Sequence, residues 1–456
     1  MNALYVIFGL GFLSLIAEIV NLKKGLTIAI IIGILAAVVL IGMDWNTNQS
    51  FYNEMVTFDN AAISFTALIL VISIFWFWMA GDYFSDQPHQ TDRSALILFS
   101  LSGALIMVSF SNMAMLFLGI EVLSISLYVL AGSNKNSLLS NEASFKYFLM
   151  GSFATGFLLM GIALIYGATG SFNIQKIAVS VMEQPALPGF FYVGIILMLV
   201  GMAFKISAVP FHFWAPDVYE GSPITITAFM STVVKIAAIA AFYKLFTIFY
   251  QVPETSWRPL GIILQAITVL TLIVPNVTAV FQTNVKRLLA YSSVGNVGYI
   301  LLAFISGGNR GEVVFYYLTA YSLASIAAFT VLYKIEKSGN GTFKGLFKRN
   351  PLMALLMTVA LLSLAGIPPL AGFLAKYLVF VQALEADHSG LVIIAIITSL
   401  TGVFYYFRVL ISMFQDSGDA SVVNDSFSSK LLMIILLALI IGIGLFPDFL
   451  TMLMAA

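Results

Sequence analysis

The segment GMAFKISAVPFHFWAPDVYEGSP (residues 201–223) follows directly on the apolar run FFYVGIILMLV (residues 190–200). The apolar run predicts a helix inside a membrane, because a helix that is hydrophobic all round is either fully buried or surrounded by lipid. Pro210 and Pro216 then interrupt it, since proline lacks the backbone N–H that a helix interior needs. Lys205 and His212 lie beside this break. The segment therefore predicts an interrupted membrane helix that carries titratable side chains.

The composition extends this prediction to the whole chain. Its 456 residues are 60% hydrophobic and 9% charged, with a mean hydropathy of +1.00, whereas a soluble domain carries about 25% charged residues. Apolar runs of about 20 residues, the length that crosses a bilayer, recur from end to end. The first, ALYVIFGLGFLSLIAEIV (residues 3–20), lacks the basic start and the cleavage site of a signal peptide, which indicates a retained helix. The predicted fold class is an all-α polytopic membrane protein.

The absence of cysteine excludes an iron–sulfur cluster held by thiolates of this chain. The histidines, His89, His212 and His388, are too few and too far apart in the sequence to indicate a haem or metal site. We therefore expect no cofactor, no metal ion and no electron transfer in this chain. A formal net charge of zero and the lack of a glycine-rich phosphate loop give no indication of nucleic-acid or nucleotide binding.

Polar and helix-breaking residues divide the chain into about 14 predicted membrane helices. The turn sequence SFSNM (residues 109–113) separates two of them that would otherwise form one overlong helix. The predicted spans are 3–21, 25–43, 59–81, 94–110, 112–132, 143–168, 189–220, 222–250, 258–282, 288–306, 311–336, 351–384, 388–414 and 430–455.

The distribution of lysine and arginine predicts the orientation, because these residues concentrate in cytoplasmic loops. With the N-terminus outside, the outer loops keep only Lys176, Arg258 and Arg310, with Lys244 near a helix end. An even number of spans then places the C-terminus outside as well. The inner loops would carry Lys23, Lys24, Arg93, Lys135, Lys286, Arg287, Lys334, Lys337, Lys344, Lys348, Arg349 and Lys430.

The two longest spans, 189–220 and 351–384, share an interruption with a lysine nearby. The second span is broken at AGIPPLAGF (residues 365–373), and Lys376 follows the break. These are the seventh and twelfth predicted spans, five apart. Because five is an odd number, a second repeat of five helices would cross the membrane in the opposite orientation to the first. Paired interrupted helices in an inverted repeat mark the transport site of many carriers. We predict an N-terminal three-helix segment (1–93), a first repeat of spans four to eight (94–250), a second, inverted repeat of spans nine to thirteen (251–415) and a C-terminal helix (416–456).

Glu121, Lys205, Lys235 and Lys376 lie within predicted spans, away from the snorkelling range of most other charges. A charge at the centre of a membrane helix costs roughly 2.5–3.5 kcal/mol. One explanation is that acid and amine pair as structural contacts between helices, and Lys235 could serve such a contact alone.

The other explanation is a proton relay, in which a contact between Glu121 and Lys205 forms and breaks. Burial lowers the pKa of a lysine and a nearby carboxylate raises it. A change from about 10 to about 7 corresponds to roughly 4 kcal/mol, comparable with about 2.3 kcal/mol for moving one charge against 100 mV. The helix break would admit water and leave the lysine room to switch partners.

Four further residues near these breaks and helix ends have less specific roles. His212 could shuttle protons or could bond a carbonyl freed by Pro210. Lys146, near the start of its span, could join the relay or extend to the membrane interface. Asp217 and Glu220 are expected to cap or anchor a short helix.

Three motifs carry a resemblance to a known family: KISAVPFHFWAPDVYEGSP (205–223), NVKRLLAYSSVGNVGYIL (284–301) and LLSLAGIPPLAGFLAKY (361–377). They resemble the antiporter-like, proton-pumping subunits of respiratory complex I, the NADH:quinone oxidoreductase, and their Mrp antiporter relatives. The resemblance covers roughly residues 60–415. Within the family the chain is most similar to subunit N of the bacterial enzyme. Subunit M typically has a glutamate at the position of Lys376, and subunit L adds a long lateral helix after its last span.

The resemblance implies a role for each matched residue. Glu121 would be the acid of the fifth helix, and Lys205 its partner on the broken seventh. Lys235 would connect the two halves, and Lys376 would pass protons to the other half-channel. Lys146 matches a lysine of the family's sixth helix, and His212 its Pro-Phe-His segment.

Asn296 departs from the family pattern, which usually has a histidine at this position. Asparagine can hydrogen-bond a water molecule but cannot take up a proton at neutral pH. A water that bridges Asn296 would be needed to continue a relay there.

The resemblance also implies where the chain acts. NADH, FMN, iron–sulfur clusters and quinone would be bound by other subunits, and this chain would be a non-redox, proton-translocating subunit in the bacterial inner membrane. An antiporter-like M subunit and small K- and J-type subunits are the expected neighbours. Two alternatives stay open: a subunit of a stand-alone Mrp-type sodium/proton antiporter, and a scaffold whose charges serve assembly alone.

Overall fold

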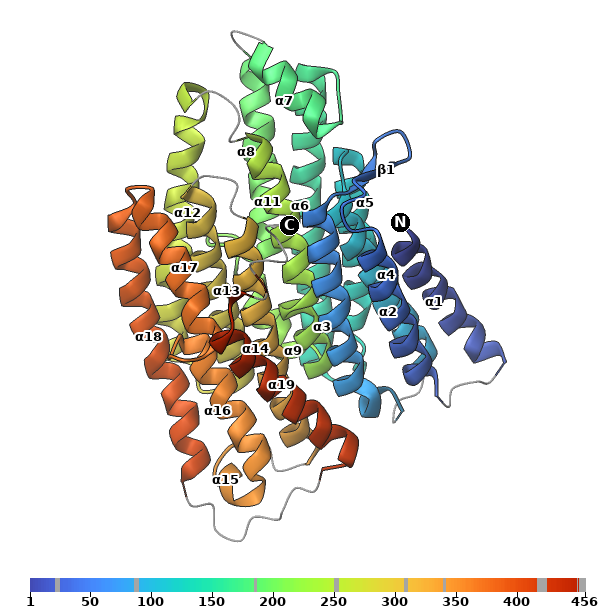
Figure 1. Ribbon diagram of the computed structural model, residues 1–456, viewed down its shortest axis with the longest axis vertical. Coiled ribbons are helices and arrows are strands. Elements are labelled where there is room, and N and C mark those ends of the chain that lie inside the picture. Colours follow the sequence, from blue (N-terminus) through green and yellow to red (C-terminus); the bar gives the residue numbers. More distant parts are fainter. Residues whose placement is uncertain are drawn as a thin grey trace.

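The computed structural model describes residues 1–20, 25–85, 90–183, 187–249, 254–306, 311–338, 342–415, 425–448 and 450. Most of them form helices that run up and down through one bundle (Figure 1). The helices are α1 (Asn2–Ile19), α2 (Leu26–Met43), α3 (Asn60–Ser85), α4 (Gln90–Ser109), α5 (Met113–Ala131), α6 (Leu138–Thr169), α7 (Ile174–Glu183), α8 (Gly189–Ile206), α9 (Trp214–Gly221), α10 (Ile224–Ser231), α11 (Val233–Phe249), α12 (Glu254–Val280), α13 (Val285–Ile305), α14 (Gly311–Lys337), α15 (Leu346–Arg349), α16 (Pro351–Ala365), α17 (Ala371–Glu385), α18 (Ser389–Phe414) and α19 (Phe427–Leu445).

Thirteen segments of the described chain are long and apolar enough to cross a membrane, and they confirm the all-α polytopic fold. They correspond to all the predicted spans except 351–384, which is divided into the shorter helices α16 and α17. Residues 110–112 separate α4 from α5 as predicted, and the side chain of Asn112 caps α5 by accepting a hydrogen bond from the Ala114 N–H (2.9 Å).

Three features of the fold were not predicted. A hairpin of β1 (Gln49–Phe51) and β2 (Val56–Phe58) follows α2. Helix α7 buries only one face, which is why a search for continuous apolar runs misses it. The predicted span 222–250 is divided at Thr232, between α10 and α11.

The break in the seventh span extends over residues 207–213, between α8 and α9. The predicted interruption at Pro216 is wrong, because this proline lies in the first turn of α9, where a helix needs no backbone donor. Polar side chains satisfy backbone groups that the break frees. The Trp214 indole N–H donates to the Phe204 carbonyl (3.1 Å), and the Val209 N–H donates to the Thr271 hydroxyl (2.9 Å).

The second break lies between α16 and α17 and begins at Gly366, whose φ is +86°. The Gly372 N–H donates to the Ser363 hydroxyl across the break (3.1 Å). A Cβ atom at Gly372 would lie 1.8 Å from the Ser363 carbonyl oxygen, so only glycine fits this approach. Both spans predicted to be interrupted are thus interrupted, and in both the chain resumes as a helix.

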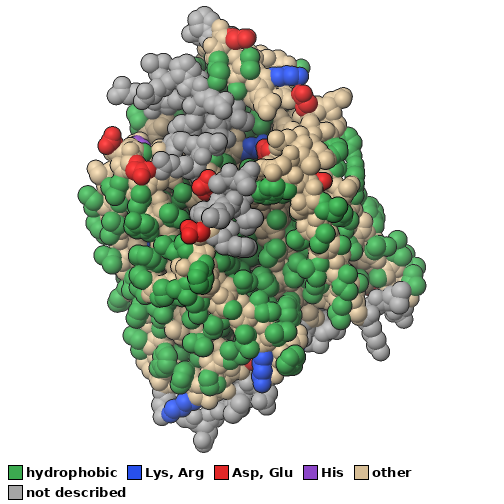
Figure 2. All heavy atoms as spheres, in the orientation of Figure 1, with side chains coloured by type: hydrophobic (Ala, Val, Ile, Leu, Met, Phe, Trp, Pro, Cys, Tyr) green, Lys and Arg blue, Asp and Glu red, His purple; other side chains and the backbone are tan. Residues whose placement is uncertain are grey.

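Charged and apolar surfaces divide the molecule into a middle band and two ends. Hydrophobic side chains cover the middle of the face shown in Figure 2, and charged side chains gather toward its ends. The β-hairpin and α7 lie at one end, which we call the α7 end, and α15 lies at the other, which we call the α15 end (Figure 1). The first residues of α1 and the last residues of α19 both point toward the α7 end (Figure 1). Lys23, Lys24 and Arg310, which entered the orientation argument, lie outside the described residues, as does His89.

Glycine residues allow α6 and α8 to approach each other closely. A Cβ atom at Gly161 would lie 2.6 Å from the Gly194 carbonyl oxygen, and one at Gly194 would lie 2.9 Å from the Gly161 carbonyl oxygen. Close approach of this kind is how membrane helices gain packing energy where no water is present to drive them together.

We predict that Gly161→Val destabilises the protein, because its side chain forces α6 away from α8. Overpacking of this kind costs roughly 1–3 kcal/mol. Gly156→Val, on the same helix with open space around its Cβ position, is the matched control. The measurement is the melting temperature in mild detergent; equal melting temperatures for both variants would contradict the predicted contact.

Candidate functional site

Three lysines lie in the interior of the bundle, with 5% (Lys205), 2% (Lys235) and 7% (Lys376) of their surface exposed. Their amines donate hydrogen bonds to hydroxyl or carbonyl oxygens. Among the described residues, no carboxylate lies within 4.0 Å of any of the three amines. An amine bound to neutral oxygens can lose its proton without leaving a partner carboxylate unpaired, which is the costly step for a buried ion pair.

Lys205 lies at the end of α8, one residue before the helix stops. Its amine donates to the Ser124 hydroxyl on α5 (2.5 Å) and lies 5.9 Å from the centre of the Tyr147 ring. The Ser124 hydroxyl in turn donates to the Ile120 carbonyl. The amine is therefore anchored to the neighbouring helix by a hydroxyl group.

Glu121 lies one turn before Ser124 on α5, as its three-residue spacing requires. It interacts with Lys205 electrostatically but forms no hydrogen bond or ion pair with it. The buried Oε1 atom of Glu121 has no hydrogen-bond partner. The predicted contact between the carboxylate and the amine is thus absent in this structure, with Ser124 binding the amine instead.

Lys235 lies on α11, where it faces α13 and α14. Its amine donates to the Ser293 carbonyl (2.5 Å), and the Tyr321 hydroxyl donates to the Ser293 hydroxyl (2.7 Å). The ring of Tyr321 lies 6.0 Å from the amine. One residue of α13, Ser293, thus joins the lysine to a tyrosine of α14.

Lys376 lies on α17, after the second break, and reaches back to it. Its amine donates to the Ala365 carbonyl at the end of α16 (2.9 Å) and to the Ser399 hydroxyl on α18 (2.9 Å). The Tyr299 ring lies 4.9 Å from the amine. Lys376 therefore satisfies a carbonyl that the break frees.

Polar groups connect the surroundings of Lys235 with those of Lys376. The Tyr317 hydroxyl donates to the Asn296 side-chain oxygen (2.8 Å), whose amide N–H donates to the Ser292 carbonyl (2.8 Å). A cavity of ≈ 10 Å³ touches Asn296, Tyr317, Tyr321 and Lys376. About this volume holds one water molecule, so the position of Asn296 suits the bridging water that the sequence suggested.

The surroundings of Lys205 are less directly joined to those of Lys235. Helix α8 packs against α11, but among the described residues no hydrogen bond links the Lys205–Ser124 pair with the Lys235–Ser293 pair. His212 lies in the break after Pro210, with 3% of its surface exposed, and its Nδ1 atom has no hydrogen-bond partner. The imidazole ring lies against the ring of Phe213.

Lys146 belongs to a separate network of charges near the α15 end. Its amine lies 2.7 Å from Asp217 and 2.7 Å from Glu142. Arg287 binds Asp217 (2.9 Å) and Glu220 (2.7 Å), so the network joins α6 and α9 to α13. Asp217 and Glu220 thus anchor the short helix α9, as expected, through contacts with cations of other helices.

The candidate site contains several groups that the sequence did not single out. They are the hydroxyl partners Ser124, Ser293 and Ser399 and the tyrosines between Lys235 and Lys376. Serine and tyrosine are common in membrane helices, so nothing in the sequence alone sets these apart. Among the described residues, no three His, Asp or Glu side chains converge in a way that could hold a metal ion.

The interrupted helices and the buried lysines define a class of antiporter-like membrane proteins. Residues 110–402 match the family model described as NADH:quinone oxidoreductase/Mrp antiporter, TM. The NADH-quinone oxidoreductase subunit N of Flavobacterium psychrophilum is 43% identical over 453 residues, which cover 98% of this chain and 99% of that protein. The chain belongs to the family of subunit N of NADH-quinone oxidoreductase.

Solved structures share the fold over nearly the whole chain. A chain of respiratory complex I from Thermus thermophilus aligns with a TM-score of 0.84 and 30% identity, over 98% of both chains. A chain of the Mrp complex from Dietzia sp. aligns with a TM-score of 0.84 and 20% identity, over 99% of this chain and 94% of that one. At this identity the Mrp likeness concerns the fold alone.

We predict that Asp217→Asn lowers the free energy of unfolding by roughly 1 kcal/mol, because Lys146 and Arg287 each lose an ionic partner at a partly exposed site. High salt should reduce the difference between variant and wild type. Glu54→Gln is the control, since its contact with Lys176 is longer (3.9 Å) and more exposed. Thermal unfolding at low and high salt measures both; a Glu54→Gln effect as large as that of Asp217→Asn would contradict the network.

Proposed function

We propose that this protein is a proton-translocating, non-redox subunit of an NADH:quinone oxidoreductase, in which Lys205, Lys235 and Lys376 carry protons. The observation that supports this most strongly is that all three amines are buried and bound to neutral oxygens, two of them beside helix breaks. Glu121 would favour the protonated state of Lys205 when the two approach each other. Subunit N relatives share the chain's full length, which supports the same role here.

The transfer itself requires only changes of hydrogen-bond partner. A proton that leaves Lys235 would pass through the Tyr321 hydroxyl and a water in the small cavity to Lys376. Tyr321 and Lys376 both line this cavity. Moving one charge against 100 mV requires about 2.3 kcal/mol, so a signal from neighbouring subunits must shift the affinity of each amine by a comparable amount. His212 and Lys146 are proposed as supporting residues, at the first break and in the network beside it.

The setting of the protein follows from the same proposal. NADH, FMN, iron–sulfur clusters and quinone would be bound by other subunits, and an antiporter-like M subunit and small K- and J-type subunits would lie beside this chain. We place the α15 end on the cytoplasmic side of the bacterial inner membrane, because basic loops favour that side, so both termini would be periplasmic. The four predicted parts (1–93, 94–250, 251–415 and 416–456) are proposed as an N-terminal segment, two inverted repeats and a C-terminal helix.

A role in a stand-alone Mrp-type antiporter is the alternative. The same buried lysines would serve it, but the relatives with 43% identity are subunits of NADH-quinone oxidoreductase, whereas the Mrp chain shares 20% identity. Purification of the native protein distinguishes the two, since peripheral redox subunits accompany it only in the first case.

We predict that Lys205→Ala and Lys376→Ala each reduce proton pumping per assembled complex on the order of a hundredfold, since loss of a positioned proton-transfer group has effects of this size. Lys176→Ala, at an exposed site on α7, should leave pumping unchanged. Pumping is measured in inside-out membrane vesicles, with the amount of assembled complex determined in parallel. Wild-type pumping in either lysine variant at normal assembly would refute the relay, and a loss of assembly with normal pumping per complex would support a scaffold role.

A further inference from the structure

Helix α19 packs against the two helices that flank the second break, α16 and α17, and against α14. In the view of Figure 1 it crosses in front of α14. One side of α19 is exposed and apolar, for example at Ile434, and the other side is buried, at Leu436, Ile440 and Gly444. The buried side thus ends at a glycine in the last turn of the helix.

Gly444 touches the backbone at the point where α17 begins. A Cβ atom at Gly444 would lie 2.3 Å from the Pro369 carbonyl oxygen and 2.6 Å from the Ala371 nitrogen. Non-bonded atoms need about 3.5 Å, so a side chain here would displace one of the two helices by on the order of 1 Å. Gly442, on the same helix, has open space at its Cβ position. The close approach is therefore a property of Gly444 and not of the whole turn.

The start of α17 is also confined on the side of α16. A Cβ atom at Gly372 would lie 1.8 Å from the Ser363 carbonyl oxygen of α16. On the side of α19, the Tyr316 hydroxyl of α14 donates to the Ile443 carbonyl (3.0 Å), directly beside Gly444. Neither neighbour can move away from α17 without losing packing or a hydrogen bond.

The position of α17 determines where the amine of Lys376 lies, because this lysine is five residues after the first residue of the helix. The amine donates to Ala365 on α16 (2.9 Å) and to Ser399 on α18 (2.9 Å). Hydrogen bonds of this kind extend to about 3.2 Å, so a displacement of α17 by on the order of 1 Å would weaken both.

We propose that Gly444 is a positioning residue for Lys376, through which α19 fixes the start of α17 and thereby the hydrogen bonds of the amine. The inference rests on the proposed function, and it gives the C-terminal helix a part in proton transfer.

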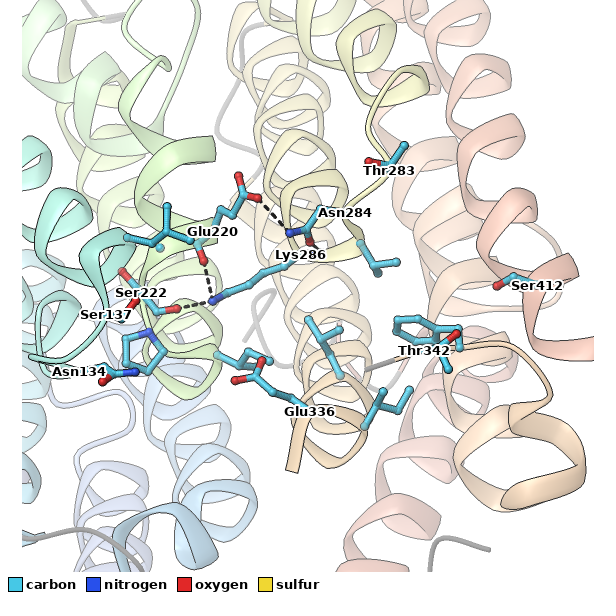
Figure 3. A pocket seen from close by; sticks show the side chains of 18 of the residues that line it. Asn134, Ser137, Glu220, Ser222, Thr283, Asn284, Lys286, Glu336, Thr342 and Ser412 are labelled. Atoms are coloured by element: carbon cyan, nitrogen blue, oxygen red, sulfur yellow. Dashed lines mark hydrogen bonds between the residues drawn. The ribbon is translucent and has the colours of Figure 1, made fainter. Parts of the chain in front are cut away.

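The helix that follows the first break is held in a different way. Figure 3 shows Asn284 and Lys286 meeting Glu220 in the last turn of α9. The Asn284 side chain donates to the Glu220 carboxylate (2.9 Å), and the Lys286 amine donates to the Glu220 carbonyl (3.0 Å). Flexible side chains of this kind can follow a movement of α9, whereas the backbone of α19 cannot adapt to α17. The rigid contact is on the helix that carries its lysine after the break.

The test compares two variants that each add one methyl group to α19 in the assembled enzyme. Gly444→Ala places the methyl group against the start of α17, and Gly442→Ala places it in open space. Both gain the same helix propensity, so they differ in the contact alone. Tyr316→Phe loosens the end of α19 without adding an atom, and Lys376→Ala tests the relay itself. Pumping is measured across a range of pH in inside-out vesicles, with the amount of assembled complex determined in parallel.

We expect Gly444→Ala to lower proton pumping per assembled complex at least about tenfold, since a misplacement of about 1 Å can cost about a hundredfold. Gly442→Ala should keep pumping within about twofold of wild type. The pH at which pumping is half-maximal should shift in Gly444→Ala and in Tyr316→Phe, because the proton affinity of an amine depends on its hydrogen bonds. A loss of stability alone would not move this pH.

Normal pumping in Gly444→Ala, an equal loss in Gly442→Ala, or a loss without a pH shift refutes the positioning role. If Gly444→Ala does not assemble, Tyr316→Phe decides: a shifted pH profile supports the role and an unchanged profile overturns it. In all these cases a loss of pumping in Lys376→Ala leaves the relay standing. Normal pumping in Lys376→Ala overturns the proposed function itself.

Discussion

In the part of the chain that the structure describes, the amines of Lys205, Lys235 and Lys376 each donate a hydrogen bond to a neutral oxygen, and the rest of the site depends on these bonds. In a membrane interior, an amine without a partner would be too costly, and an amine locked to a carboxylate would not readily release its proton. Hydroxyl and carbonyl oxygens avoid both outcomes. They satisfy the donors of the amine, and they leave its charge free to respond to a signal from outside the chain.

The second helix break supplies one of these oxygens, the Ala365 carbonyl, and both breaks are constrained by the membrane. Every backbone polar group in lipid must find a partner inside the protein, so each break needs dedicated donors and acceptors. At the first break Trp214 and Thr271 provide them, and the Lys205 amine is left to bind Ser124 on another helix. At the second break Lys376 itself binds the freed Ala365 carbonyl. Lys205 thus lies before the first break and Lys376 after the second, which gives the two amines different surroundings.

The sequence predicted the features that follow from composition and local chemistry. Long apolar runs predicted the membrane helices, prolines predicted the two broken spans, and rarity of charge singled out Glu121, Lys205, Lys235 and Lys376. What it could not predict depends on which helices pack together. The binding of Lys205 to Ser124 in place of Glu121, and the place of Lys146 in a network with Asp217, are set by contacts between helices distant in the sequence. The break was misplaced at Pro216 because a proline ends a helix or begins one, and the residue alone does not distinguish the two.

In the proposed function, these buried amines gain and lose protons during turnover. Infrared difference spectra of the assembled enzyme, with lysine labelled by heavy nitrogen, report this directly by comparing the resting state with the state under turnover. We expect ammonium bands that shift with the label, change on turnover and disappear when Lys205, Lys235 and Lys376 are all replaced by methionine. Label-sensitive bands that do not change on turnover, or that persist in the triple variant, would contradict it.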